Sequence, residues 1–329
     1  MAARAVPVVT SWHSNPPFGM TFFGHPTGRY GDGRGTIDFI AEEFGLPLLP
    51  ASLNNSSSIR QGVNFAVGGA TVTDVDFFER NNLVPFKLLN CSLNVQLGWF
   101  EQLRPQICDN TSLQGYRDYD CFSRSLFFFG EIGVNDYSLL WLAGKTKKEV
   151  KAFVPTVVKK IAIGVERLIK EGVVYIVVPG NPPNGCSPTM LILLANKTDY
   201  DHIGCLRDLN SVAVYHNTIL RVAIGSLRDK HPQARIIFAD FYNPIVEIFK
   251  NPTHFGVAHP LRTCCGGGGR YNYNVSAICG MPGVTACKDP EAYVSWDGVH
   301  YTEATNRYIA EGWLHGPYAD PPILSVVRS

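Results

Sequence analysis

An aspartate and a histidine stand three positions apart near the end of the chain, in the stretch SWDGVH that ends at His300. An Asp this close to a His can accept the proton on Nδ1, which fixes the tautomer and leaves Nε2 as a general base. A base of this kind serves a nucleophile such as a serine hydroxyl. Taken alone, Asp297 is equally explained as the cap of a turn that leads into a helix.

Two glycine-containing segments upstream offer groups that stabilise negative charge on an oxygen. Asn135 lies in GEIGVND, directly after the apolar run 125–130, and its amide can donate to a developing oxyanion. Gly69 follows the apolar run 63–67, and its backbone N–H is a second donor. The local alternatives are an Asx turn at Asn135 and a tight strand exit with positive φ at Gly69. Each alternative is favoured for its segment alone, but the combination with the Asp–His pair favours an active site.

Apolar runs alternate with helical patterns along the chain, which predicts an α/β fold with a parallel sheet. Strands are predicted at 63–67, 125–130, 173–180 and 234–240. Helices are predicted from Thr36 as a cap, over 95–103, after the capping box Thr146–Glu149, over 207–230 and after His300. Functional loops collect at the carboxyl ends of parallel strands, where GGAT, GEIGVND and VPGNPP are expected.

Composition excludes several classes of function. The 329 residues are 45% hydrophobic, 12% aromatic and 17% charged, which suits a globular protein with a sizeable core. The net charge of +1 gives no basic surface for nucleic acid. There is no apolar run long enough to be an integral membrane segment. The histidines lack metal-ligand spacing, and the four glycines 266–269 lack the context of a phosphate loop, so neither a metal nor an organic cofactor is expected.

Cysteines and glycosylation motifs indicate an oxidising compartment. The chain has nine cysteines without a CxxC pair, so disulfides are expected and one cysteine should stay unpaired. N-x-S/T motifs begin at Asn54, Asn55, Asn90, Asn110, Asn196 and Asn274. The first residues do not form the apolar core of a signal peptide. The body of the chain is therefore typical of a secreted glycoprotein although its beginning is not.

Two pairings of cysteines are predicted from their positions. Cys186 and Cys205 flank a helical insertion after the strand 173–180 and would close a loop. The adjacent residues Cys264 and Cys265 should each form a disulfide with a different cysteine, and Cys279 or Cys287 should be one of these partners. The segment 251–290 is expected to be irregular and stapled by these bridges.

Longer stretches resemble the plant GDSL esterase/lipases of the SGNH hydrolase superfamily. They cover the chain from about residue 15 to the end: PPFGMTFFGHPTGRYGDGR, NFAVGGAT, LGWFEQL, GEIGVNDY, VPGNPPNGCSP, YNYNVSAICGMPG, SWDGVHYTEA and GPYADPPIL. The resemblance implies a single hydrolase domain over 15–329, after an atypical segment 1–14. It implies a three-layer α/β/α sandwich with a mainly parallel, flavodoxin-like sheet.

The activity implied by the resemblance is hydrolysis of carboxylic esters through a serine acyl-enzyme, without a cofactor, in a secreted protein. Substrates would be lipid acyl esters, cuticle precursors or acetylated cell-wall sugars. Gly69 matches the glycine of the family's second block and Asn135 the oxyanion donor of the third. Asp297 and His300 match the pair of the fifth block. Val134 stands where plant members have a second glycine, for which a local change in loop shape is expected.

The family's first block, F-G-D-S, supplies the serine nucleophile, and no Gly-Asp-Ser occurs in the 329 residues. Ser11 and Ser14 are poor substitutes because no Gly-Asp precedes them and Pro7 interrupts the preceding apolar run. The chain is therefore expected to be an N-terminally truncated or alternatively started member whose first strand is missing or replaced and whose catalysis is impaired. The alternative is a non-catalytic secreted protein that binds an ester or polysaccharide on the same scaffold.

Overall fold

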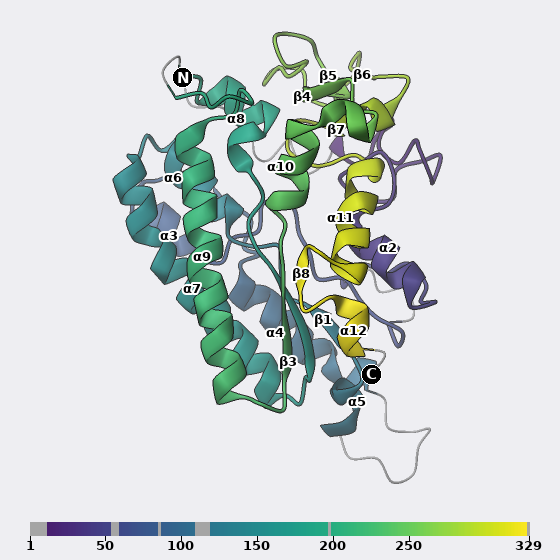
Figure 1. Ribbon diagram of the computed structural model, residues 1–329, viewed down its shortest axis with the longest axis vertical. Coiled ribbons are helices and arrows are strands. Elements are labelled where there is room, and N and C mark those ends of the chain that lie inside the picture. Colours follow the sequence, from purple (N-terminus) through teal and green to yellow (C-terminus); the bar gives the residue numbers. More distant parts are fainter. Residues whose placement is uncertain (1–11, 54–58, 85–86, 109–118, 197–198, 328–329) are drawn as a thin grey trace. The chain divides into compact units, whose positions relative to one another are not determined.

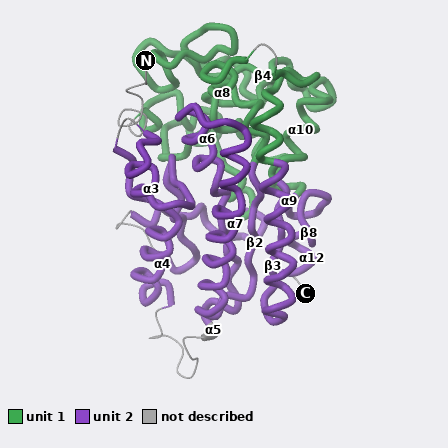
Figure 2. The backbone as a smooth tube through the Cα atoms, turned by 90° about the vertical axis from the view of Figure 1, so that its left-hand side faces the viewer, with its two compact units in different colours: residues 1–40, 182–213, 241–312 green, residues 41–181, 214–240, 313–329 purple. Residues whose placement is uncertain are grey.

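The computed structural model describes residues 12–53, 59–84, 87–108, 119–196 and 199–327 (Figure 1). The chain forms two compact units (Figure 2). The first unit consists of residues 1–40, 182–213 and 241–312, and the second of residues 41–181, 214–240 and 313–329.

The second unit contains a four-stranded sheet with the order β1-β2-β3-β8. Strands β1 (Leu126–Phe128), β2 (Tyr175–Pro179) and β3 (Arg235–Ala239) are parallel, and β8 (Ala319–Asp320) is antiparallel to β3. Their β-rich apolar sequences are buried, with Ile176, Val177 and Ile237 at 0% exposure. The predicted α/β fold with a mainly parallel sheet is confirmed, as are three of the four predicted strands.

The helices that lie wholly in the second unit are α3 (Val75–Arg80), α4 (Leu93–Ile107), α5 (Tyr119–Ser123), α6 (Val134–Leu142), α7 (Lys147–Lys170) and α12 (Ile323–Val327). Three further helices have residues in both units: α2 (Thr36–Glu43), α9 (Arg207–Lys230) and α11 (Glu303–His315). The five predicted helices are present as α2, α4, α7, α9 and α11, and α3, α5, α6 and α12 were not predicted. The capping box predicted before α7 is present, because the Thr146 hydroxyl accepts the N–H of Glu149 and the Glu149 carboxylate accepts that of Thr146. The apolar face of α7 is buried and contacts α4 and α6.

The predicted strand over 63–67 is wrong. Only Asn64 pairs there, in an isolated bridge with Ala51, and Ala66 is exposed. The physical reason is local, since the Asn64 side chain accepts the N–H of Ala66 at 2.8 Å and turns the chain away from a ladder. The first strand that the family resemblance calls for, together with Ser11, lies outside the described residues.

The first unit is built from short elements. These are η2 (Asn184–Cys186), α8 (Pro188–Leu193), α10 (Asn243–Lys250), η3 (Pro252–Phe255), β4 (His259–Thr263), β5 (Cys265–Gly266), β6 (Thr285–Ala286), η4 (Pro290–Ala292) and β7 (Tyr293–Ser295). Strands β4 and β7 pair in parallel, and β5 and β6 pair in antiparallel fashion. Helix α2 begins at Thr36 itself instead of being capped by it, and Asp38 accepts the N–H of Gly35 at 2.9 Å.

Four disulfides cross-link the described chain: Cys108–Cys121, Cys186–Cys205, Cys264–Cys287 and Cys265–Cys279. The predicted Cys186–Cys205 bridge and the separate partners of the two adjacent cysteines are confirmed. Cys91 is the free cysteine and is buried. The last two bridges form a small core with Phe18 and Trp296, so they take the place of apolar packing in a loop-rich segment.

Sequon asparagines that fall within the described residues are exposed, namely Asn90, Asn196 and Asn274. Asn54, Asn55 and Asn110 lie outside those residues. Of the helices described, none is both long and apolar enough to cross a lipid bilayer.

Candidate active site

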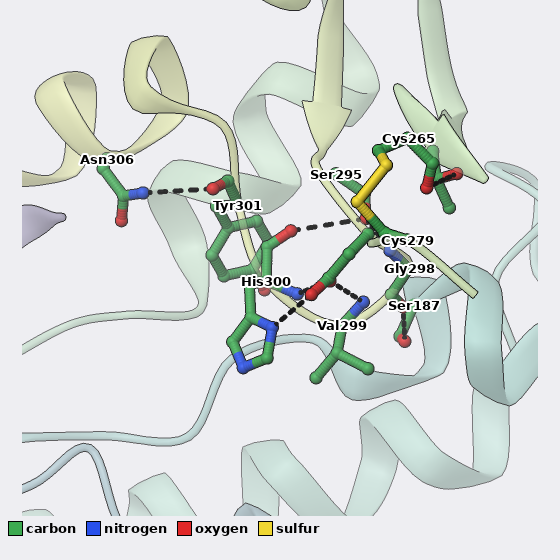
Figure 3. Close-up of polar contacts among 11 residues, drawn as sticks. Ser187, Cys265, Cys279, Ser295, Gly298, Val299, His300, Tyr301 and Asn306 are labelled. Atoms are coloured by element: carbon green, nitrogen blue, oxygen red, sulfur yellow. Dashed lines mark hydrogen bonds and ion pairs between the residues drawn. A yellow bond between two sulfur atoms is a disulfide. The ribbon is translucent and has the colours of Figure 1, made fainter. Parts of the chain in front are cut away.

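Asp297 and His300 lie on the turn between β7 and α11 (Figure 3). One carboxylate oxygen of Asp297, Oδ1, accepts the backbone N–H groups of Val299 at 2.9 Å and His300 at 2.8 Å. The other oxygen, Oδ2, lies 2.7 Å from Nδ1 of the His300 ring. The contacts fit both explanations of Asp297, because one oxygen closes the turn and the other contacts the imidazole, and the catalytic role stays a prediction.

The environment of this pair keeps Asp297 charged. Burial raises the pKa of the Asp297 carboxyl, but the adjacent His300 ring and the N–H donors of His300 and Val299 outweigh burial, and the pKa is lowered. The Asp297 side chain is 12% exposed and that of His300 is 37% exposed. The Asp297 carboxylate therefore contacts Nδ1 of an imidazole whose side chain is partly exposed to solvent.

Gly298 gives the turn its shape. Its φ of +102° lies in the left-handed region, and an added Cβ would come 2.6 Å from the Tyr273 ring. The carbonyl of Gly298 accepts the Ser187 hydroxyl at 2.6 Å and the N–H of Thr189 at 3.2 Å, and its N–H donates to the Ser295 hydroxyl at 3.0 Å (Figure 3). Gly298, one of the two residues between Asp297 and His300, is thus bonded through both its N–H and its carbonyl, which restricts the motion of the pair.

The stapled segment borders the same turn. Cys265 donates its N–H to the carbonyl of Trp296 at 2.7 Å, and Cys264 donates to the carbonyl of Ser295 at 3.0 Å. Trp296 in turn donates its N–H to the carbonyl of His300 at 2.8 Å. The disulfides therefore anchor the backbone on which the Asp–His pair stands.

An aromatic contact supports the His300 ring and was not anticipated from the sequence. The ring of Tyr30 lies 4.7 Å from that of His300, centroid to centroid, and the ring of His13 stacks on Tyr30 at 4.3 Å. His13 and Tyr30 are far from His300 in sequence, and the family-like stretch 16–34, which contains Tyr30, does not by itself indicate this contact.

Asn135 and Gly69 are brought together within the second unit. Asn135 lies in the first turn of α6, and its Nδ2 donates to the carbonyl of Ala70 at 2.8 Å, a contact between residues 65 positions apart. This bond uses Nδ2, whereas an Asx turn would use Oδ1, so it does not decide between the two explanations of Asn135. Gly69 is exposed and has the predicted positive φ, +83°, although no strand precedes it, and a Cβ added to it would meet nothing within 4 Å. One amide hydrogen of Asn135 and the N–H side of Gly69 are the groups that could meet an oxyanion.

A polar cluster lies beneath the loop that leads to Asn135. Asn181 donates its Nδ2 to Glu131 at 2.8 Å and its backbone N–H to Oδ1 of Asn217 at 2.7 Å. The Tyr137 hydroxyl lies 2.7 Å from Nδ1 of His216. Burial raises the pKa of Glu131 to about 8 and lowers the pKa of His216 to about 3, so His216 is neutral at physiological pH.

The four residues predicted from the sequence thus form two pairs. Asp297 and His300 belong to the first unit, and Gly69 and Asn135 to the second. That all four line one cleft stays a prediction. No group of three or more His, Cys, Asp or Glu side chains suited to a metal ion occurs among the residues described.

A mainly parallel α/β fold and a histidine oriented by an aspartate are features of the serine-type hydrolases. The chain belongs to the GDSL-like lipase/acylhydrolase family, whose sequence model matches residues 11–313. By family it is therefore an ester-bond hydrolase, and its fold is that of the GDSL/SGNH hydrolases.

Curated plant proteins are similar along nearly the whole chain. Two GDSL esterase/lipases of Arabidopsis thaliana are each 44% identical over 315 residues, covering 93% of this chain and 78% and 76% of the relatives. Acetylajmalan esterase 2 of Rauvolfia serpentina is 39% identical over 318 residues, covering 96% of this chain and 84% of the relative.

Proposed function

We propose that this protein is a carboxylic ester hydrolase of the GDSL type in which His300 is the general base and Asp297 orients it. In this proposal a serine hydroxyl attacks the acyl carbonyl, His300 takes the hydroxyl proton, and the N–H of Gly69 and the amide of Asn135 stabilise the oxyanion. The bond from the acyl carbon to the alcohol oxygen then breaks, and protonated His300 gives its proton to the departing alcohol, which leaves an acyl-serine. Water, deprotonated by His300, attacks the acyl-serine, and the proton returns to the serine oxygen as the carboxylic acid leaves. The family match across residues 11–313 supports assigning residues 15–329 to one hydrolase domain.

The observation that carries this proposal is the 2.7 Å contact between His300 Nδ1 and Asp297 Oδ2. A hydrogen bond at this position selects the tautomer with a free Nε2 lone pair, which is what proton abstraction requires. The remaining 37% exposure of the His300 side chain leaves that edge of the ring accessible.

Esters of carboxylic acids are the proposed substrate class. The name of acetylajmalan esterase 2, one of the similar proteins, supports a small acyl group such as acetate on a larger alcohol. Lipid acyl esters, cuticle precursors and acetylated cell-wall sugars belong to the same chemical class. The four disulfides and the exposed sequon asparagines support a secreted glycoprotein.

The test compares two forms of the protein with para-nitrophenyl acetate and longer acyl esters. One form is the 329-residue chain, and the other carries in front the Gly-Asp-Ser segment of a similar GDSL esterase/lipase. Because the 329 residues contain no Gly-Asp-Ser, we expect the extended form to turn over the ester and the 329-residue form to be slower by several orders of magnitude. His300→Ala should abolish turnover in the extended form. Activity that survives His300→Ala would overturn the proposal.

A second function is favoured by the same sequence fact. Without the serine block, these 329 residues could bind an ester or a polysaccharide without hydrolysing it. Calorimetric titration with an acetylated oligosaccharide separates the two functions. Turnover in the extended form would support the hydrolase, whereas binding of the oligosaccharide by the 329-residue form, with no turnover in either form, would favour the non-catalytic protein.

A further inference from the structure

The two segments that carry the proposed oxyanion donors are joined by one buried carboxylate. Asp136, which follows Asn135 in α6, is 0% exposed. Its Oδ2 accepts the N–H of Val72 at 2.8 Å and its Oδ1 accepts the N–H of Thr73 at 2.9 Å. Together with the bond from Asn135 to the Ala70 carbonyl at 2.8 Å, three hydrogen bonds hold the residues that follow Gly69 against the first turn of α6.

We propose that Asp136 is a positioning residue whose ionised carboxylate sets the separation between the Gly69 N–H and the Asn135 amide. This inference rests on the proposed function, in which those two groups bind the oxyanion. Oxyanion donors act only when each lies within about 2.7 to 3.1 Å of the charged oxygen, so their mutual distance matters as much as their presence. A shift of about 1 Å in such a site lowers the rate by roughly 100-fold.

The chemistry of the carboxyl group explains why its charge is needed. An ionised carboxylate has acceptors on both oxygens and can serve two N–H donors at once. A protonated carboxyl, or the amide of an asparagine, places a donor on one of the two atoms, where it would face the N–H of Val72 or Thr73. One of the two bonds to the segment after Gly69 is then lost, and that segment can move relative to α6.

The charged and titratable groups around Asp136 set the pH at which its carboxylate becomes protonated and one of the two bonds is lost. Burial raises the pKa of Asp136 to about 6, and the N–H of Val72, the side chain and N–H of Thr73 and the charge of Lys160 on α7 act in the opposite direction. Glu131 in the preceding loop and Tyr137 on α6 also interact with it, and Asp136 contributes to the raised pKa of both. The two-bond arrangement should be complete above about pH 6 and fail as the pH falls through that value.

Amide hydrogen exchange of the 329-residue chain tests the arrangement without any need for activity. Exchange at Val72 and Thr73, corrected for the intrinsic rate, should rise as the pH is lowered from about 8 to 5 in the wild type. In Asp136→Asn it should be about tenfold faster at pH 8 and lack the step near pH 6. The matched control is Asp240→Asn, which removes another buried carboxylate of the second unit and should keep the wild-type profile. Unchanged protection and an unchanged pH step in Asp136→Asn would overturn the inference.

Kinetics of the form extended by a Gly-Asp-Ser segment test the positioning role. Asp136→Asn should lower kcat by about 10- to 100-fold with little change in KM, because the oxyanion exists only in the transition state. A normal kcat in a variant that has lost the exchange step would show that Asp136 is purely structural and would overturn the role. If the extended wild type shows no turnover, the proposed function fails, and the exchange profile alone decides whether the carboxylate holds the two segments together.

Discussion

The carboxylate of Asp297 binds His300 twice, through Oδ1 to the backbone N–H at 2.8 Å and through Oδ2 to the ring Nδ1 at 2.7 Å. Backbone and side chain of the proposed base are thereby fixed by the same group. The imidazole cannot rotate about its side-chain bonds without breaking the second bond, and the turn cannot open without breaking the first. Both of these bonds lie within the four residues 297–300.

Replacing Asp297 by asparagine should separate these two tasks. The amide oxygen can still close the turn, and the NH₂ group then faces Nδ1, which must accept that hydrogen bond, so the tautomer with the proton on Nε2 is selected. In the form extended by a Gly-Asp-Ser segment we expect kcat to fall by roughly 10²- to 10⁴-fold in steady-state assays. Asp289→Asn, at an exposed position of the same unit, is the control and should leave kcat unchanged.

The same substitution has a predicted effect on stability with a definite sign. The pKa of Asp297 is lowered in the folded protein, so its contribution to stability is present above the ordinary pKa of the carboxyl and is lost as the pH falls through the folded value. Asp297→Asn should therefore be less stable than the wild type at neutral pH. Urea unfolding as a function of pH should show this difference shrinking below about pH 4. A difference that grows in acid would contradict the assignment.

Gly298→Ala should lower the stability of the protein by more than the positive φ of Gly298 alone would account for. Gly256 provides the comparison, because it also has positive φ (+69°) but an added Cβ meets nothing within 4 Å. We expect Gly256→Ala to cost about 1 to 2 kcal/mol for the left-handed conformation. Gly298→Ala should cost about 1 to 3 kcal/mol more, because its Cβ collides with Tyr273. Equal losses in urea denaturation would show that the collision relaxes freely.

Glu131→Gln should flatten the pH dependence of stability around neutrality. The pKa of Glu131 is raised to about 8, so its contribution is fully present below the ordinary value of 4.5 and is lost as the pH rises through the folded value. The unfolding free energy of the wild type should therefore fall between about pH 5 and pH 8, and that of Glu131→Gln should fall less. Glu149→Gln is the control, since the pKa of Glu149 is lowered to about 2 and its effect lies in acid. A parallel decline in wild type and Glu131→Gln would refute the assignment.

Removing the Cys265–Cys279 bridge should loosen the segment that anchors the Asp–His turn. The two cysteines are 14 positions apart, and closure of a loop of this size is worth about 3 kcal/mol. We expect the double variant to serine to lose stability of that order in chemical denaturation, whereas Cys91→Ala, at the free cysteine, should lose less. Thiol titration of the oxidised, denatured wild type should find one free cysteine, and a larger number would contradict the four bridges.

Local sequence was sufficient for much of this protein. The capping box of α7, the apolar runs of β2 and β3 and the pairing of Asp297 with His300 were all predictable. Each depends on residues within a few positions of one another, whose spacing dictates which groups meet. The run 63–67 does not form a strand, because the side chain of Asn64 accepts the backbone N–H of Ala66.

Contacts between distant segments could not be read from spacing. Three contacts join residues that no periodicity relates: the bond from Asn135 to Ala70, the bond from Val72 to Asp136, and the tilted ring contact between Tyr30 and His300. Sequence patterns specify which side chains face a core or a turn, but not which remote group lies opposite. The folded chain decides that through packing and the need to pair every buried polar atom. The sequence therefore identifies the candidate site residues, whereas the fold decides which distant groups those residues contact.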